Sequence, residues 1–164
     1  IFKKFKKEDI NRITQLVNKT NQFNLTVKRL NLEEIVNISK NSNFLTIAGN
    51  LKDKFGDNGL ITIFIGKIKK QTIDIVVWLM SCRVFNRNLE FALFDYLISQ
   101  CKNKGISTIC GNYIKSKKNF IVKDFYKTLG FNKVKSNKTE GKWEYKITNK
   151  YVKKNKIIKI TNEK

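Results

Sequence analysis

The most constraining feature of the sequence is a long apolar run, TIDIVVWLMSCRVF, at residues 72–85. A run of this length, rich in β-branched and aromatic residues, predicts a buried central strand. It is followed by an amphipathic helical pattern that ends at Gly105 and by a second strand pattern at residues 106–114. The middle of the chain therefore predicts an α/β domain built around a buried sheet.

The remaining segments continue this alternation. Apolar spacing predicts helices at about 8–20 and 31–40, and the second begins with Asn31 and Glu34 at capping-box spacing. Strands are expected at 44–53 and 59–70, joined by KFGDNG, whose residues 57–59 favour a tight turn. A helix at 119–130 closed by Gly130 and a hairpin at 131–136 and 141–148 complete the order.

Length and composition limit the class of protein. At 164 residues the chain can bury one core, and it has neither an internal repeat nor a Pro- or Gly-rich linker, so we expect one domain at 1–150 and a basic tail at 151–164. No apolar run approaches the roughly 20 residues of a membrane helix. Three cysteines without C-x-x-C spacing indicate neither a disulfide framework nor a metal site, and we expect a reduced, cytoplasmic protein.

The charge is the most unusual part of the composition. Thirty-four Lys and Arg against 13 Asp and Glu give a net charge of +21, which would attract nucleic acid, phosphorylated cofactors or an acidic protein. The alternative is a compositional bias, because Lys, Asn and Ile are over-used together while Pro and His are absent. Nucleic-acid binding is not favoured, since the aromatic residues follow core periodicity and do not alternate with lysines on one face.

The element order and one motif resemble the GNAT acyltransferases. DFYKTLGF at 124–131 is similar to the family's Phe-Tyr-x-x-x-Gly-Phe signature, and Asn119 stands where the family often has Asn. The resemblance implies a mixed α/β (α+β) sheet with helices on both faces. It also implies that 72–82 and 107–114 are parallel strands that splay apart to form the site.

Four blocks resemble a narrower group, the C-terminal GNAT-like half of FkbH-like proteins. They are RITQLVNKTNQFNLT, LKDKFGDNGLI, WLMSCRV and VKDFYKTLGF, in the same order. The resemblance implies a HAD-like domain elsewhere in the full protein and an acyl carrier protein as partner. The first residue is Ile1 and not Met, which suggests part of a longer chain.

The resemblance places a cofactor at the segment before the helix of 88–105. In GNAT proteins this turn offers backbone N–H groups to the pyrophosphate of acetyl-CoA or another acyl-CoA, or to a phosphopantetheine arm. The residues implied in cofactor binding are Cys82, Arg83, Val84, Asn86, Arg87, Asn88 and, from the later helix, Asn119. Asn86 and Asn88 replace the family's glycines. Asn tolerates the left-handed backbone better than most residues, which would preserve the cradle, whereas its side chains would crowd the phosphates.

The resemblance also implies a catalytic residue, Tyr126, whose hydroxyl would protonate a leaving thiolate as a general acid. The alternative is a core aromatic whose hydroxyl meets a backbone carbonyl. No metal is expected.

The TNQFN block after the first helix is a polar cluster around one aromatic. We expect substrate contact from its residues Asn21, Gln22, Phe23 and Asn24. Glu90, Asp57 and Asp124 are further carboxylates near the expected cleft, where helix capping and turn chemistry explain them equally well.

Two function classes remain open from the sequence. One is an acyltransferase domain that engages acyl-CoA or the thioester of an acidic acyl carrier protein. The other is a non-catalytic GNAT-shaped scaffold that positions a carrier protein or a HAD-like domain.

Overall fold

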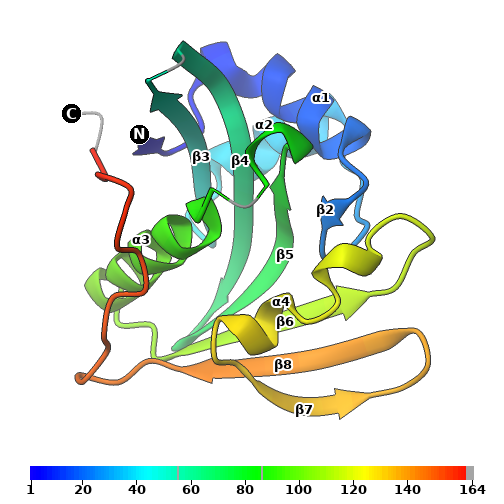
Figure 1. Ribbon diagram of the computed structural model, residues 1–164, viewed down its shortest axis with the longest axis vertical. Helices are drawn as coiled ribbons and strands as arrows, with labels where there is room; N and C mark the ends of the chain where they lie inside the picture. Colours follow the sequence, from blue (N-terminus) through cyan, green and yellow to red (C-terminus); the bar gives the residue numbers. More distant parts are fainter. Residues whose placement is uncertain (55, 86, 162–164) are drawn as a thin grey trace.

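A single mixed sheet organises the molecule (Figure 1). The computed structural model describes residues 1–54, 56–85 and 87–161. The strands run in the order β1-β3-β4-β5-β6-β8-β7, with β2 paired to β5 off this path. Their bounds are β1 Phe2–Lys3, β2 Phe23–Asn24, β3 Phe44–Asp53, β4 Gly56–Lys69, β5 Thr72–Met80, β6 Thr108–Ile114, β7 Asn132–Ser136 and β8 Glu140–Lys146.

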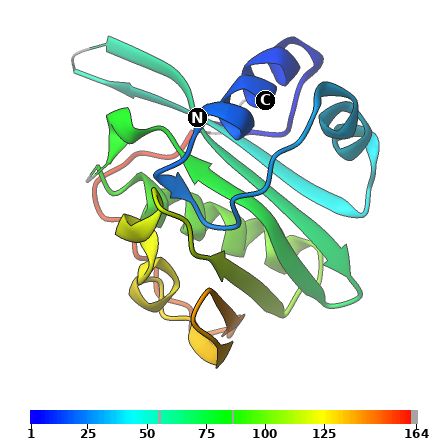
Figure 2. The same ribbon diagram turned by 90° about the vertical axis from the view of Figure 1, so that its right-hand side faces the viewer.

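Helices cover both faces of the sheet, α1 and α2 on one side and α3 on the other (Figure 2). The α-helices are α1 Ile10–Lys19, α2 Leu32–Lys40, α3 Leu89–Asn103 and α4 Phe125–Thr128. The described residues also form the short 3-10 helices η1 Lys7–Asp9, η2 Cys82–Val84 and η3 Phe120–Val122. Alternation along the central strands explains the two layers. In β5, Val77 and Leu79 face α1, while Trp78 and Met80 join the core beneath α3 and α4.

Several sequence expectations are confirmed. The capping box of α2 is present, since Glu34 N donates to Asn31 Oδ1 at 2.9 Å and Asn31 N donates to Glu34 Oε2 at 2.7 Å. β3 has the expected bounds. β5 and β6 are parallel neighbours, paired over Thr72–Asp74 with Thr108–Cys110. Beyond these three pairs the strands part, so the expected splayed mixed sheet is the observed one.

Three local expectations were wrong. The strand expected at 72–85 ends at Met80, and Cys82–Val84 form η2 instead. The helix expected at 119–130 is divided into η3 and a four-residue α4, because Asn119 uses its side chain to fix a loop. The tight turn expected at 57–59 lies inside β4 instead. Asp53 already pairs with Gly56, and Gly59 N donates to Asp57 Oδ1 at 2.7 Å in an irregular part of the pairing.

The C-terminal segment packs against the domain over residues 151–161. Its contacts centre on Asp95, a buried carboxylate of α3. Asp95 accepts hydrogen bonds from the Tyr151 hydroxyl, from Lys154 N at 3.0 Å and from Asn155 N at 2.9 Å. Further along, Ile158 and Ile160 pack on the core below α3. This basic segment is thus held by a buried acceptor and apolar contacts.

Candidate functional site

The gap between β5 and β6 is filled by the chain itself. Leu25, which directly follows β2, is fully buried. Its N–H donates to the Trp78 carbonyl at 3.3 Å, and its carbonyl accepts from Ile114 N at 2.9 Å. The Thr26 hydroxyl donates to the Val76 carbonyl at 2.8 Å. Residues 23–26 therefore bridge the two strands where they part, as an inserted extended segment.

Asn119 fixes this inserted segment to the end of β6. Its side chain is fully buried, and its amide nitrogen donates to the Asn24 carbonyl at 2.9 Å and to the Ile114 carbonyl at 2.8 Å. Its amide oxygen accepts from Ser116 N at 2.8 Å. Asn119 therefore links residue 24, residue 114 and residue 116 through one side chain.

Two hollows lie on either side of the inserted segment. One, the α3–α4 pocket, has a volume of about 470 Å³. Its walls include four apolar side chains and two carboxylates, namely Phe23, Met80, Phe85, Phe125, Glu90 and Asp124. The other, the sheet groove, has a volume of about 740 Å³ and lies over β5, β6 and β8, with Thr26, Tyr113 and Trp143 in its lining. Phe23 lines the first hollow and Thr26 the second, so the inserted segment separates them.

Tyr126 lies in the core. It has no exposed surface, and its hydroxyl donates to the Asn112 carbonyl at 3.2 Å. Its ring packs against Gly111 so closely that a Cβ at that position would come within 2.4 Å of Tyr126 Cε1. Burial raises the pKa of Tyr126 above its ordinary value. This is the arrangement that the core-aromatic alternative describes, a buried ring whose hydroxyl meets a backbone carbonyl.

The segment before α3 holds the residues expected at the phosphates. Cys82 and Arg83 are exposed in η2, whereas Val84 is buried in the core. Asn86 lies outside the described residues. Asn88 adopts the left-handed conformation with φ of +59° and begins α3 without a side-chain cap, as an Asn in place of Gly can.

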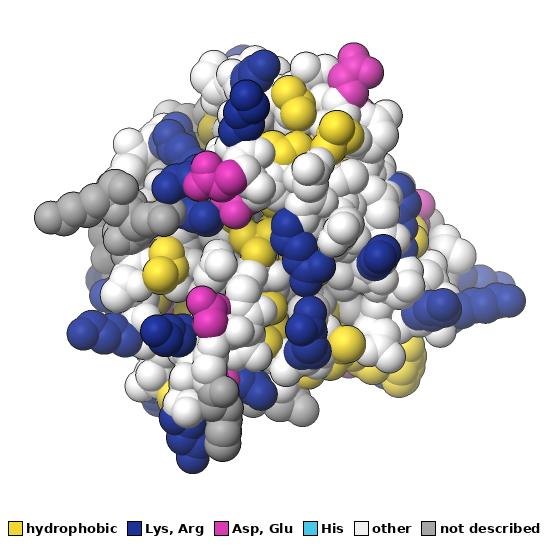
Figure 3. All heavy atoms as spheres, turned by 90° about the horizontal axis from the view of Figure 1, so that it is seen from above, with side chains coloured by type: hydrophobic (Ala, Val, Ile, Leu, Met, Phe, Trp, Pro, Cys, Tyr) yellow, Lys and Arg dark blue, Asp and Glu magenta, His cyan; other side chains and the backbone are white. Residues whose placement is uncertain are grey.

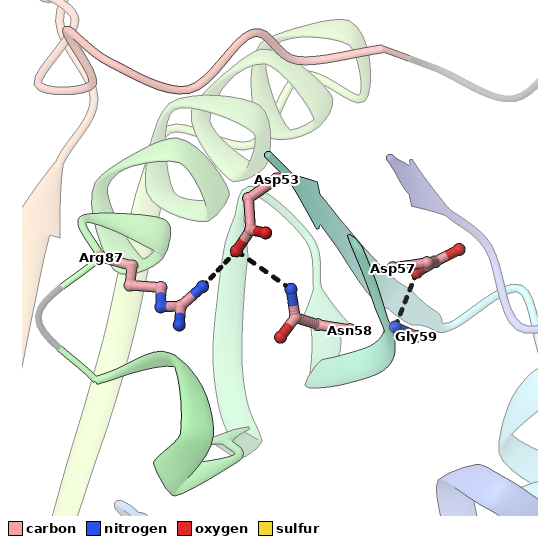
Figure 4. A network of polar contacts seen from close by, with 5 residues as sticks. All are labelled: Asp53, Asp57, Asn58, Gly59 and Arg87. Carbon is pink, nitrogen blue, oxygen red and sulfur yellow. Dashed lines mark hydrogen bonds and ion pairs between the residues drawn. The ribbon is translucent and has the colours of Figure 1, made fainter. Parts of the chain in front are cut away.

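Arg87 forms an ion pair outside the α3–α4 pocket. Its guanidinium pairs with Asp53 at the end of β3, and Asn58 Nδ2 donates to the same carboxylate at 3.2 Å (Figure 4). The nearby Asp57 is occupied by Gly59 N, as the same figure shows. The arginine thus ties the start of α3 to the β3–β4 hairpin and does not line the α3–α4 pocket.

Two carboxylates lie beside the start of α3, where the resemblance to GNAT proteins implies phosphate contacts. Glu90 lies in the first turn of α3 and lines the α3–α4 pocket together with Asp124. The first turn of a helix has free N–H groups that attract anions. Two carboxylates beside it oppose that attraction. The pocket therefore suits an apolar chain better than a group with several phosphates.

The residues of the TNQFN block have different roles: one lines the α3–α4 pocket, and two others accept hydrogen bonds within the chain. Phe23 packs edge-on against Phe125, with ring centroids 4.9 Å apart, and forms part of the α3–α4 pocket. Asn24 is buried, and its Oδ1 accepts from Val27 N at 3.0 Å. Asn21 Oδ1 accepts from Arg29, while Gln22 is exposed. Of the four, only Phe23 lines either of the two hollows.

Sequence reasoning missed β2, although a signal was present. Phe23, Asn24, Leu25 and Thr26 alternate between apolar and polar residues with the period of a strand. The stretch is only four residues long, shorter than a typical strand. In the described part of the chain, no cluster of three or more metal-ligating side chains occurs, and no helix is long and apolar enough to cross a bilayer.

Comparison with known proteins identifies the fold. No protein-family profile and no curated protein sequence matches the chain. Among solved structures it is similar to the ribosomal-protein-S18-alanine N-acetyltransferase of Escherichia coli, with 12% identity, a TM-score of 0.68, and coverage of 93% of this chain and 99% of that one.

Two further solved structures have a similar fold. The PaiA N-acetyltransferase of Thermoplasma acidophilum, solved with coenzyme A, has 16% identity and a TM-score of 0.66 over 89% of this chain and 98% of that one. A probable acetyltransferase of Staphylococcus epidermidis has 12% identity and a TM-score of 0.69 over 90% of this chain and 99% of that one. Together with the splayed sheet, these likenesses show that the chain has the GNAT acyltransferase fold.

Proposed function

We propose that this chain is a GNAT-fold transferase domain that engages a phosphopantetheine thioester in the α3–α4 pocket, as the C-terminal part of an FkbH-like protein with a HAD-like domain. The observation that carries the proposal is the pocket itself. It opens beside the start of α3 and is walled by Phe23, Phe85 and Phe125. A similar fold has been solved with coenzyme A.

The lining favours a carrier-bound arm over free CoA. A phosphopantetheine arm is an extended, largely uncharged chain that aromatic walls can cover. CoA brings a pyrophosphate and a further phosphate, and these would approach Glu90 and Asp124. An arm attached to a protein carries a single phosphodiester at its far end. We therefore take an acidic acyl carrier protein in the cytoplasm as the partner, attracted by the +21 chain.

A non-catalytic scaffold is the second candidate, and a specific observation favours it. The inserted segment separates the α3–α4 pocket from the sheet groove, and the Tyr126 hydroxyl is engaged by the Asn112 carbonyl. A thioester in the pocket would not meet an acceptor in the groove unless residues 23–26 moved. In this case the domain would hold the carrier while the HAD-like domain performs the chemistry.

Calorimetric titration with pantetheine, CoA and a holo-acyl carrier protein tests the binding proposal. We expect pantetheine and the holo-carrier to bind, with CoA weaker than pantetheine. Replacing Glu90→Gln and Asp124→Asn together should strengthen CoA binding roughly tenfold and leave pantetheine unchanged. The control is Glu8→Gln with Glu33→Gln, which removes the same charge at exposed positions. Absence of binding by all three ligands would refute the proposal.

An activity assay separates the two candidates. Acyl-pantetheine and a range of amine acceptors are added to the chain, and formation of the acylated amine is measured. Turnover above the uncatalysed rate would support the transferase, whereas binding without turnover would support the scaffold.

A further inference from the structure

The loop that joins β6 to α4, residues 115–123, exposes two adjacent apolar side chains. Phe120 is 61% exposed and Ile121 is 56% exposed, while the next residue, Val122, is buried. Isolated exposed apolar residues are common, but two large ones side by side on a fixed turn are a typical contact feature. We call residues 115–123 the β6–α4 loop.

The β6–α4 loop is held in its conformation by hydrogen bonds of Asn119 and Ser116. Asn119, in its middle, is anchored to Ile114 and Asn24 as described above, and it also accepts from Ser116 N. Ser116 Oγ accepts in turn from Asn119 N at 3.1 Å and from Lys118 N at 3.3 Å. The two apolar side chains are thus presented by an ordered loop, which lowers the entropy cost of binding a partner.

Lysines surround the apolar pair. Lys115, Lys117, Lys118 and Lys123 are all exposed, and Lys123 Nζ lies 4.6 Å from the centroid of the Phe120 ring. A hollow of about 590 Å³ between α4 and the β7–β8 hairpin continues this surface with Lys127, Lys133 and Lys138. On the face that Figure 3 shows, by contrast, Lys and Arg side chains are dispersed among neutral and acidic ones.

One member of the apolar pair, Ile121, also lines the α3–α4 pocket, together with Val122 and Phe85. A partner seated on the β6–α4 loop would therefore stand at the entrance of the pocket and could direct a flexible attachment into it.

We propose that the β6–α4 loop is the docking surface for an acidic protein whose contact face has an apolar residue at its centre. In terms of the proposed function, on which this inference rests, that protein is the acyl carrier. Apolar contact with Phe120 and Ile121 supplies affinity, and the lysines supply steering. A second copy of the chain is disfavoured because two molecules of charge +21 repel each other.

The apolar contact is tested with an acyl carrier protein in holo and apo forms, titrated into the full chain. Phe120→Ser with Ile121→Ser should weaken both forms about tenfold or more, since docking does not need the arm. The matched control is Val152→Ser with Ile157→Ser, two equally apolar residues that are 79% and 75% exposed on the C-terminal segment. The control should change affinity less than about twofold.

The steering role is tested by association kinetics at low and moderate salt. Lys117→Ala with Lys118→Ala should slow association at least severalfold at low salt, and the difference should shrink as salt rises. Lys153→Ala with Lys156→Ala removes the same charge from exposed positions elsewhere and should have a smaller effect. If both lysine pairs changed the association rate equally, association would depend only on the net charge of the chain. That result would refute a localised docking surface at the β6–α4 loop.

Other outcomes distinguish this inference from the proposed function. If pantetheine binds but the apo-carrier does not, the docking surface is refuted and the pocket proposal stands. If neither pantetheine nor either carrier form binds, both fail. If the Phe120 and Ile121 changes alter the sedimentation of the chain alone, or its affinity for a single-stranded RNA, the surface serves self-association or nucleic acid and the inference is wrong.

Discussion

At the residue scale, Asn119 shows how one buried amide can organise two distant segments. It joins residue 24 to residue 114 and shapes the β6–α4 loop. Three of its side-chain hydrogen bonds go to backbone groups, namely the carbonyls of Asn24 and Ile114 and the N–H of Ser116.

Replacement of Asn119 by alanine should therefore be costly. We expect Asn119→Ala to lower the free energy of unfolding by about 2–4 kcal/mol, because the carbonyls of Asn24 and Ile114 and the N–H of Ser116 lose their partner together. Urea unfolding measures the change. Asn132→Ala on the exposed strand β7 is the control and should cost less than about 0.5 kcal/mol. Similar costs for both variants would contradict the anchoring role.

Tyr126 leads to a prediction for alkaline pH. Its pKa in the folded state is raised above the ordinary value of 10.0 by burial, so folding favours the protonated hydroxyl. The stability from this group is present below pH 10 and is lost as pH rises toward the folded-state pKa. We expect the free energy of unfolding to fall more steeply above pH 10 in the native chain than in Tyr126→Phe, by up to about 1.4 kcal/mol per pH unit. If the free energy of unfolding depended on pH in the same way in both proteins, the pKa of Tyr126 would not be raised by folding and the prediction would be wrong.

At the element scale, the segment that contains β2 fills the gap between β5 and β6. Its neighbour Leu25 bonds to Trp78 on one side and to Ile114 on the other, in the manner of a strand in a sheet. This arrangement predicts slow hydrogen exchange.

Amide exchange measured by NMR should show Leu25 and Ile114 protected as strongly as the amides of β5, and the exposed Lys28 exchanging rapidly. Rapid exchange at Leu25 with protected β5 amides would instead mean that the segment opens readily, which would favour the transferase over the scaffold.

The elements also show what the sequence could and could not predict. Strong local signals, such as the capping box of α2 and the apolar run of β5, gave correct elements. The division of 119–130 was missed because it depends on Asn119 meeting Asn24, 95 residues away in sequence. For the same reason, local patterns could not tell that Arg87 pairs with Asp53 or that Tyr126 packs on Gly111.

At the scale of the whole molecule, the C-terminal segment contributes to stability. Truncation after Lys150 would remove three hydrogen bonds to Asp95 and leave its carboxylate without these partners beneath the lost segment. We expect a loss of about 3 kcal/mol or more, seen as a lower melting temperature. Asp95→Asn should partly restore the truncated chain yet destabilise the full one. Equal melting temperatures for the full and truncated chains would contradict this account.

The ends of the described chain meet at one edge of the sheet. Phe2 N donates to the Thr161 carbonyl at 3.3 Å, and β1 is the strand at the opposite edge from β7. A domain joined near residue 1 or residue 161 would therefore start from the β1 edge, while the β6–α4 loop follows β6, which is separated from β1 by β3, β4 and β5 in the sheet. Under the function proposed above, an attached domain and a docked carrier protein would thus contact different parts of the sheet.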